Sequence, residues 1–362
     1  MGETSALPAT RSHAEHGLRE LRPLLVADDV NEVAINPDGA VWAERADAEH
    51  MVRTGHHYPP GKVLQLSKHL AGETKNVLGP KHPIVSGSLH AFGQVLRVQI
   101  VVPPAVEDGA SLSIRKYVSR ILDVGEIGFL EGRQVSVEGE RRARLAEIAK
   151  LAQAGRLAEL FQQAIDQRMN ILVSGGTSSG KTTVARALLS LADRAERLVT
   201  IEDARELHLP HENGVALIAE RSATSERTPA QLLVAALRMR PDRLILGEMR
   251  GEEALAFLEA INTGHPGSIS TIHADSPVLA LERLALMVMR VGHRQTRQDV
   301  LEYAARTIDV IVQVGRRGGK RGVLEVFLPA DFQTIDPPLE SRARPRSEAP
   351  SFICLESSAR LL

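Results

Sequence analysis

The most specific chemical signal in this sequence is a glycine-rich run of eight residues. Its members are Gly175, Gly176, Thr177, Ser178, Ser179, Gly180, Lys181 and Thr182. They satisfy the spacing G-x-x-x-x-G-K-[ST], in which the glycines let successive backbone N–H groups turn inward around a β-phosphate. The lysine of this motif reaches the β- and γ-phosphates, and its final hydroxyl coordinates Mg²⁺. An apolar run (171–173) precedes the motif and a helical pattern that begins at Thr183 follows it. We therefore predict that residues 175–183 bind ATP and that Thr182 binds Mg²⁺.

Carboxylates follow two further apolar runs, and ATP hydrolysis needs such groups to hold a metal ion and to orient water. Glu202 and Asp203 end the run that begins at residue 198, and Glu248 follows the run 244–246. We predict that Glu248 positions and polarises the attacking water. Glu202 is expected to hold the hydration shell of the metal, with Asp203 as the alternative. P-loop enzymes usually carry an aspartate where this chain has Gly247. Direct coordination of the metal from this run is therefore in doubt, which makes Glu202 and Asp203 more important as candidate metal ligands.

A histidine, His273, lies in a fourth strand-like run, residues 268–275. At the end of a strand, an imidazole can hydrogen-bond the γ-phosphate of ATP and so sense its presence. The alternative is a histidine whose ring nitrogens are satisfied within the fold. The position alone leaves both interpretations open.

These candidate residues need a sheet to bring them together, and the C-terminal half of the chain has the pattern for one. Short, almost wholly apolar runs alternate there with helical patterns, which is typical of a buried parallel sheet with covering helices. The run 228–231 is a capping box with proline at the first helical position. Two apolar runs, 310–314 and 323–327, bracket eight residues rich in glycine and arginine. They predict a hairpin with a basic tip, Arg316 to Arg321.

Residues 1–135 have a different pattern, that of a mixed α/β unit. Two apolar runs flank Asn36-Pro37-Asp38-Gly39, a strong turn signal, and so predict a hairpin. Strand-like runs follow at 95–102 and 112–114, and apolar residues at 63, 66 and 70 have helical spacing. We therefore predict three parts: an N-terminal α+β domain (1–135), an ATPase domain with a mostly parallel sheet (136–335) and a polar tail (336–362).

The composition narrows the remaining classes of function. Basic and acidic side chains number 44 and 45, so the formal net charge of -1 gives no global attraction to nucleic acid or anionic lipid. The one cysteine, Cys354, excludes a disulfide framework and a zinc site of the paired-cysteine kind. No apolar run reaches the roughly 18 to 20 residues of a membrane helix, and the polar N-terminus lacks the apolar core of a secretory signal. We expect a cytoplasmic protein whose contact with any membrane is peripheral.

Four elements stand in a fixed order, and together they resemble the type II/type IV secretion ATPase superfamily. They are Gly175 to Thr182, Thr200 to Leu207, Leu244 to Arg250 and Gly264 to Asp275, which are similar to the Walker A motif, Asp box, Walker B motif and His box of that superfamily. The segments 237–243, 264–267 and 271–276 look like the traffic ATPase of type IV secretion systems. So do the N-terminal segments 31–36, 97–100 and 113–116. The resemblance covers about residues 18 to 330.

This resemblance implies a PAS-like N-terminal domain, a RecA-like ATPase domain and a homohexameric ring. The ring would lie on the cytoplasmic side of the inner membrane, docked on proteins of the secretion channel. Each subunit would use ATP hydrolysis to power substrate translocation or pilus assembly. The resemblance also implies that nucleotide lies between the two domains, where Arg97 and Arg115 match the arginines that close on its phosphates. A glycine before Glu248 is common in the superfamily, so Gly247 fits the family pattern.

Three alternative functions stay open at this point. A motor that retracts type IV pili belongs to the same superfamily, whereas extension and type II motors usually carry a tetracysteine zinc element that one cysteine cannot supply. A nucleic-acid translocase would bind DNA through the basic tip Arg316 to Arg321, although the chain has few aromatic residues to stack on bases. A P-loop kinase would transfer phosphate to a small molecule. Phosphate release without an acceptor separates an ATPase from such a kinase, and DNA-stimulated, salt-sensitive activity would identify a translocase.

Overall fold

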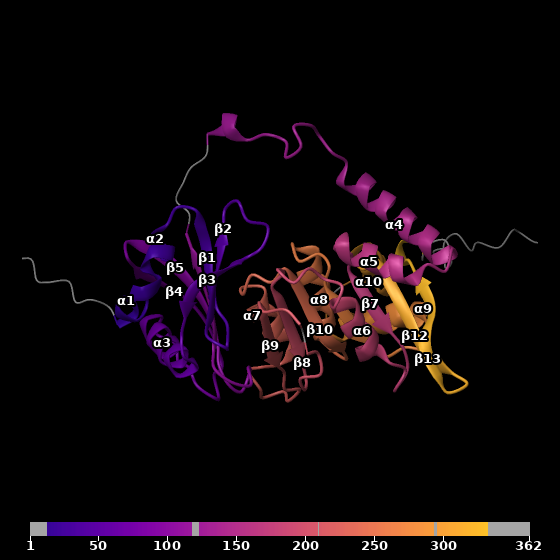
Figure 1. The fold of residues 1–362 in the computed structure, drawn as a ribbon. Coiled ribbons are helices and arrows are strands. Elements are labelled where there is room, and N and C mark those ends of the chain that lie inside the picture. Colours follow the sequence, from indigo (N-terminus) through magenta and orange to yellow (C-terminus); the bar gives the residue numbers. More distant parts are fainter. Residues whose placement is uncertain (1–12, 118–122, 209, 293–294, 332–362) are drawn as a thin grey trace, which may run out of the picture.

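The fold contains two β-sheets that lie side by side. The computed structural model describes residues 13–117, 123–208, 210–292 and 295–331. One sheet lies within residues 30–116 and the other within residues 171–327. Figure 1 shows both sheets, with residues 123–136, which lead into helix α4 (Val137–Gln153), running above them in that view. None of the described helices combines the length and the apolarity needed to cross a bilayer.

The N-terminal sheet is antiparallel throughout, with the strand order β3-β2-β1-β6-β5-β4. Its strands are β1 (Val30–Ile35), β2 (Ala40–Arg45), β3 (Val52–His57), β4 (Ile84–Ala91), β5 (Gln94–Val101) and β6 (Ser111–Lys116). The helices of this part are α1 (His13–Gly17), α2 (Arg22–Val26) and α3 (Pro60–Glu73). Apolar residues of α3 at positions 63, 66 and 70 share one buried cluster with the strands. The predicted hairpin is confirmed, because the turn at 36–39 joins β1 to β2.

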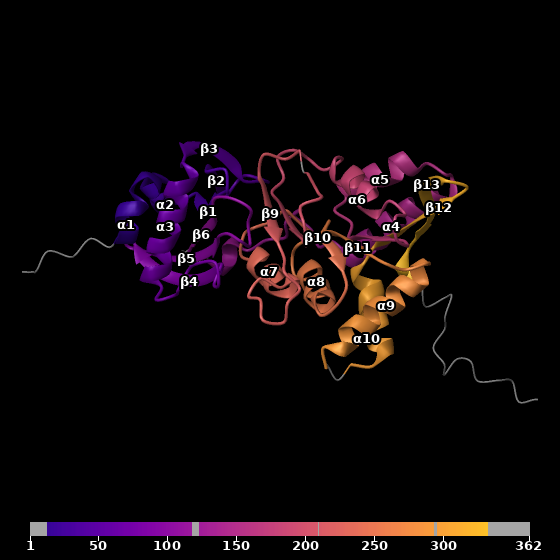
Figure 2. The same cartoon turned by 90° about the horizontal axis from the view of Figure 1, so that it is seen from below.

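The second sheet has the order β13-β12-β7-β11-β10-β8-β9, and its neighbours are parallel except for the antiparallel pair β12–β13. Its strands are β7 (Ile171–Ser174), β8 (Leu198–Glu202), β9 (Gly214–Ile218), β10 (Arg243–Met249), β11 (Ile269–Ile272), β12 (Val310–Arg317) and β13 (Lys320–Phe327). Its helices, besides α4, are α5 (Leu157–Asp166), α6 (Lys181–Leu189), α7 (Pro229–Ala236), α8 (Glu253–Asn262), α9 (Pro277–Arg290) and α10 (Arg297–Thr307). Two buried clusters show how these helices divide. One joins α4, α5 and α6 to the sheet, and the other joins α7 to α10 to its opposite face. Figure 2 gives a second view of this layered arrangement.

This architecture confirms the predicted fold class, an α/β chain with an antiparallel α+β part followed by a mostly parallel sheet. The capping box at Thr228 is confirmed too, with Gln231 closing it reciprocally. The predicted boundary after residue 135 falls between the two sheets and stays a prediction. The predicted tail, residues 336–362, lies outside the described residues.

The hairpin near the C-terminus differs from its prediction. The sequence predicts a loop of eight residues, but β12 and β13 continue to residues 317 and 320, so that Gly318 and Gly319 alone form the turn. Both glycines have positive φ angles, 56° and 81°, as a tight hairpin turn requires. The ends of both strands were not predictable from the sequence. Near the turn both faces of the hairpin are exposed, so the paired residues there are basic and show no alternation of apolar and polar side chains.

The two sheets are joined by both polar and apolar contacts. The guanidinium of Arg197, which is fully buried, donates to the side chain of Asn36 at 2.7 Å and to the carbonyl of Met239 at 2.8 Å. At the carboxyl end of β9, the N–H of Ile218 donates to the carbonyl of Ala105 at 2.8 Å. Ala105 and its neighbours Val101 and Val106 pack in the same cluster as α7 to α10. The N-terminal part therefore lies against the β9 end of the second sheet.

Candidate active site

The glycine-rich run forms the loop between β7 and α6, as the sequence predicts. β7 is buried along its length and ends at Ser174, directly before Gly175. Ser178 and Gly180 have positive φ angles, 58° and 100°, and such left-handed residues turn backbone N–H groups toward a common centre. Lys181 begins α6, so the positive end of the helix dipole points at the space that the loop encloses. The local backbone is therefore that of an anion-binding site.

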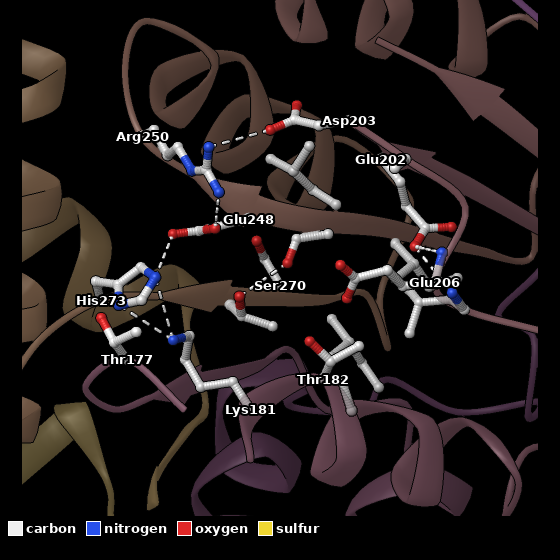
Figure 3. A pocket seen from close by; sticks show the side chains of 18 of the residues that line it. Thr177, Lys181, Thr182, Glu202, Asp203, Glu206, Glu248, Arg250, Ser270 and His273 are labelled. Carbon is white, nitrogen blue, oxygen red and sulfur yellow. Dashed lines mark hydrogen bonds and ion pairs between the residues drawn. The ribbon is translucent and has the colours of Figure 1, made fainter. Parts of the chain in front are cut away.

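A cavity of about 300 Å³ opens beside this loop, at the carboxyl ends of β8, β10 and β11 (Figure 3). Its polar lining consists chiefly of Thr177, Ser178, Lys181, Thr182, Glu202, Asp203, Glu206, Glu248, Arg250, Ser270 and His273. The remaining residues of the motif, at 175, 176, 179 and 180, form the loop itself. Thr183 is exposed on the first turn of α6 and does not line the cavity. In parallel sheets, ligands bind at this end of the strands.

Lys181, His273 and Glu248 meet in this cavity. The Lys181 ammonium lies 3.2 Å from Nδ1 and 3.3 Å from Nε2 of the His273 ring. Nε2 of the same ring lies 2.9 Å from Oε1 of Glu248. Lys181 also donates to the carbonyls of Gly175 and Gly176, at 3.1 and 3.2 Å. The sequence places these groups on three separate segments, and the fold brings all three within contact distance, as Figure 3 shows.

The protonation states of these groups follow from their surroundings. Burial lowers the pKa of the Lys181 ammonium and the pKa of the His273 ring. Burial also raises the pKa of Glu248, but a hydrogen bond from Arg250 and the charge of His273 outweigh it, and the pKa falls below its ordinary value. At neutral pH the site thus holds an ionised Glu248 beside a neutral imidazole. A carboxylate in this state can orient a water molecule and accept hydrogen bonds from it.

Arg250 is a site residue to which the sequence analysis gave no role. One of its guanidinium nitrogens lies 2.5 Å from Oε2 of Glu248, and another lies 3.3 Å from Asp203. Arg221 holds Asp203 from the other side at 2.9 Å and also donates to Glu253 at 2.8 Å. Asp203 therefore lies between two arginines and fixes the one that contacts Glu248. The carboxylate that follows Glu202 in the sequence was the only available signal for this arrangement.

Glu202 and Glu206 occupy different environments in the cavity wall. Glu202 is 5% exposed, and its Oε1 accepts backbone N–H bonds from Glu206 at 3.0 Å and from Leu207 at 2.9 Å. Burial raises the pKa of Glu202, and these hydrogen bonds oppose the effect. Glu206, by contrast, is exposed, and Figure 3 shows its carboxylate extending into the cavity on the side of Thr182. The sequence analysis did not single out Glu206, since it stands four residues past the end of an apolar strand.

Gly247 has a packing reason to be glycine. A Cβ atom at this position would lie 3.2 Å from Cγ of Glu202 and 3.3 Å from the carbonyl of Ile201. An aspartate there would also bring a second carboxylate against the buried Glu202. The close approach of β8 and β10 therefore accounts for the departure from the usual aspartate.

Arg97 and Arg115 do not reach the phosphate loop of their own chain. The two residues are cross-strand partners on β5 and β6. They line a separate cavity of about 350 Å³ between the N-terminal sheet and residues 237–242, which also contains Glu32 and Arg240. The contact of these two arginines with nucleotide phosphates stays a prediction.

Comparison with known proteins gives matches over most of the chain. The family model described as "Type II/IV secretion system protein" matches residues 132–314. The type IV secretion system protein PtlH of Bordetella pertussis is 36% identical over 340 residues, which are 89% of this chain and 97% of that protein. The type IV secretion system protein VirB11 of Bartonella quintana is 36% identical over 284 residues, 74% of this chain and 79% of the relative.

A solved structure agrees with these relatives. The crystal structure of the VirB11 ATPase from the Brucella suis type IV secretion system, in complex with sulphate, superposes with a TM-score of 0.77 at 31% identity. The match covers 87% of this chain and 97% of the other. The phosphate loop and the carboxylate beside it are what an ATPase requires. The chain therefore belongs to the type II/IV secretion system protein family and is an ATPase of its type IV secretion branch.

Proposed function

We propose that the chain hydrolyses ATP at the cavity beside the phosphate loop and that this hydrolysis powers a type IV secretion system. The observation that carries the proposal is the meeting of Lys181, His273 and Glu248 within 3.3 Å contacts at the carboxyl edge of the second sheet. The loop amides would bind the phosphates, and Lys181 would exchange its loop carbonyls for the β- and γ-oxygens. His273, which now contacts both Lys181 and Glu248, would hydrogen-bond the γ-phosphate.

Glu248 would position and polarise the attacking water. Its contact with Arg250 keeps the carboxylate ionised but also occupies one of its oxygens. A water molecule between Glu248 and the γ-phosphate would take over part of that coordination. Glu248 orients the nucleophile, and positive groups around the γ-phosphate stabilise the charge that develops there.

Magnesium would bind chiefly through the nucleotide and Thr182. Among the described residues, no group of three or more His, Cys, Asp or Glu side chains is arranged to hold a metal. This suits Mg²⁺, which keeps several waters and takes only one or two protein ligands at phosphate sites. When bound, the ion would neutralise charge on the β- and γ-phosphates. Three carboxylates after β8 line the cavity, those of Glu202, Asp203 and Glu206. Asp203 is paired with two arginines and Glu202 accepts backbone N–H bonds, so the exposed Glu206 is the freest of the three to contact the ion's water shell.

We further propose that the working form is a homohexameric ring on the inner face of the inner membrane, in contact with channel proteins of the secretion system. The family membership and the identity with PtlH and VirB11 support this assembly. In such a ring, Arg97 and Arg115 would complete the phosphate site of a neighbouring copy. The separation of their cavity from the phosphate loop within one chain supports contact between copies.

Phosphate release from ATP by the purified full chain, with Mg²⁺ and no acceptor molecule, tests the hydrolysis. Lys181→Ala should abolish turnover, since the β- and γ-phosphates lose their fixed cation. The matched control is Lys150→Ala. Lys150 is an exposed lysine on α4 that does not line the cavity. Activity of Lys181→Ala within a few fold of the wild type would overturn the assignment of this cavity.

A further inference from the structure

The hairpin β12–β13 carries basic residues that the proposed ATPase cycle leaves without a role. Arg316 pairs across the hairpin with Arg321, and Arg317 pairs with Lys320. Like charges directly opposite each other on neighbouring strands destabilise a hairpin. Among the described residues, no carboxylate forms an ion pair with any of these four side chains. Two adjacent pairs of cations on this exposed hairpin therefore lack a neutralising carboxylate among the described residues.

The two pairs lie on opposite faces of the hairpin. Val314 and Val323 are cross-strand partners, and each lies two residues from an arginine of the pair Arg316–Arg321. Because side chains alternate along a strand, the two valines and these two arginines share one face of the hairpin. Both valines pack in or against the cluster that includes α6. Val314 also abuts the phosphate loop, since a Cβ on Gly175 would lie 2.5 Å from its carbonyl oxygen. The pair Arg316–Arg321 thus faces the phosphate loop, and Arg317–Lys320 faces away.

Arg321 makes direct contact with that loop. Its Nε donates to the carbonyl of Ser178 at 2.8 Å. Its side chain also lies beside Gly180, where a Cβ would be 3.8 Å from Cδ of Arg321. The arginine is therefore held against the two loop residues that have positive φ angles.

The position of this hydrogen bond matters for phosphate binding. A loop that turns its N–H groups inward must turn carbonyls outward, and Ser178 reaches this state only in a left-handed conformation that serine adopts rarely. A donor outside the loop that binds the outward carbonyl stabilises the conformation before any phosphate arrives.

We propose that Arg321 is a positioning residue for the nucleotide: from the hairpin, it holds the peptide after Ser178 in the phosphate-binding conformation. This inference rests on the proposed nucleotide site. Arg321 acts through the loop and touches none of the reacting atoms, so its removal weakens binding more than turnover.

The experiment measures KM for ATP, kcat and the affinity for ADP on four full-length variants. Arg321→Gln removes the charge, Arg321→Lys keeps it, and Arg317→Gln is the matched control on the far face of the same hairpin. Lys181→Ala reports on the site itself. We expect Arg321→Gln to raise KM and weaken ADP binding about three- to tenfold, with kcat within about twofold, since the lost bond is charge-assisted but exposed. Arg321→Lys should recover most of the affinity, and Arg317→Gln should match the wild type.

Each outcome separates the inference from the proposed function. An unchanged KM in Arg321→Gln overturns the role of Arg321 while leaving the ATPase assignment intact. Equal losses in Arg321→Gln and Arg317→Gln also overturn it, because they would reflect only the net charge of the hairpin. A melting temperature without nucleotide that falls in Arg321→Gln together with kcat would make the role merely structural. Full activity of Lys181→Ala would instead overturn the nucleotide site on which the inference rests.

Discussion

At the scale of single residues, the site is defined by which charges are paired before ATP arrives. Lys181 is hydrogen-bonded to loop carbonyls and contacts His273, and Glu248 is paired with Arg250. Both Lys181 and Glu248 must therefore give up an existing contact when ATP and the attacking water bind. These pairs keep a buried ammonium and a half-buried carboxylate from standing uncompensated, which would be costly.

Glu248→Gln tests the role of the carboxylate most directly. Glutamine has nearly the same shape and leaves the phosphate loop untouched, so the affinity for ATP should stay within a few fold of the wild type. Without the carboxylate to orient water, kcat should fall by about 10²- to 10⁴-fold. ATP binding measured by calorimetry and phosphate release measured on the same sample check both parts. The control is Glu252→Gln, an exposed glutamate four residues on, and a Glu248→Gln chain that fails to bind ATP would contradict the water-positioning role of Glu248.

Sequence analysis predicted the phosphate loop from the spacing of its motif. It singled out Glu248 and His273 from their places at the ends of apolar runs, which are readable as strands. It gave no role to Arg250 or Arg321. Arg250 acts through a contact with Glu248 two residues away, which no periodicity marks, and Arg321 reaches Ser178 across 143 residues of sequence. Long flexible side chains that bond to distant backbone leave no pattern in the sequence.

At the scale of elements, the sheet positions the site through the close approach of β8 and β10. Core strands with nearly continuous apolar residues were predictable, whereas β3 and β4 were not, because polar residues and glycine interrupt their apolar pattern. The analysis also missed β9, a run of five apolar residues that is too short to tell a strand from a helix segment by its pattern. The predicted strand 268–275 ends at Ile272, so that His273 lies just beyond it and is free to turn toward Lys181.

Gly247→Asp tests whether β10 requires glycine beside β8. The new side chain would meet Glu202 and Ile201 at about 3.2 to 3.3 Å from its Cβ and would place two carboxylates together in a half-buried wall. We expect a loss of about 3 kcal/mol in the free energy of unfolding, from crowding and charge together. Gly247→Ala carries the crowding alone and should lose about 1 kcal/mol. Urea unfolding of both variants distinguishes the two causes, and equal stability of Gly247→Asp and the wild type would refute the packing argument.

At the scale of the whole molecule, a buried carboxylate lies between the two sheets. Glu32 on β1 is 4% exposed, and burial raises its pKa to about 7 against the attraction of Arg197. Arg115 and Arg240 also lower this pKa, and Glu44 raises it. Because the pKa of Glu32 differs between the folded and unfolded chain, the free energy of unfolding depends on pH.

The sign follows from proton binding. Between about pH 4.5 and 7 the folded chain keeps a proton on Glu32 that the unfolded chain has released. The stabilisation is therefore complete below about pH 4.5 and is lost as the pH rises through about 7. Glu32→Gln stays neutral at every pH. As the pH rises from 5 to 8, the free energy of unfolding of the wild type should therefore fall relative to that of Glu32→Gln by on the order of 2 kcal/mol. Melting temperatures of both proteins, measured over this pH range, check the change. A constant difference between the two proteins over this range would show that Glu32 is ionised throughout.

Mixed assemblies test whether Arg97 and Arg115 act on a neighbouring copy. One chain carries Lys181→Ala, and the other carries Arg97→Ala with Arg115→Ala. If the arginines complete the site of another subunit, mixing the two inactive proteins creates sites with an intact loop and intact arginines. Phosphate release should then recover to a sizeable fraction of the wild type on mixing. No recovery, in mixtures shown by light scattering to co-assemble, would place the arginines in their own chain's site.

The backbone bond between Ile218 and Ala105 has one more consequence. β9 is the last strand of the second sheet, and an open strand edge invites pairing with other chains. In this molecule Ala105 occupies part of that edge, and Val101 and Val106 cover the apolar surface beside it. A fragment that begins at residue 136 would lack this cover. Such a fragment should precipitate at concentrations the full chain tolerates, because the N-terminal part would no longer cover the edge of β9 against pairing with another chain.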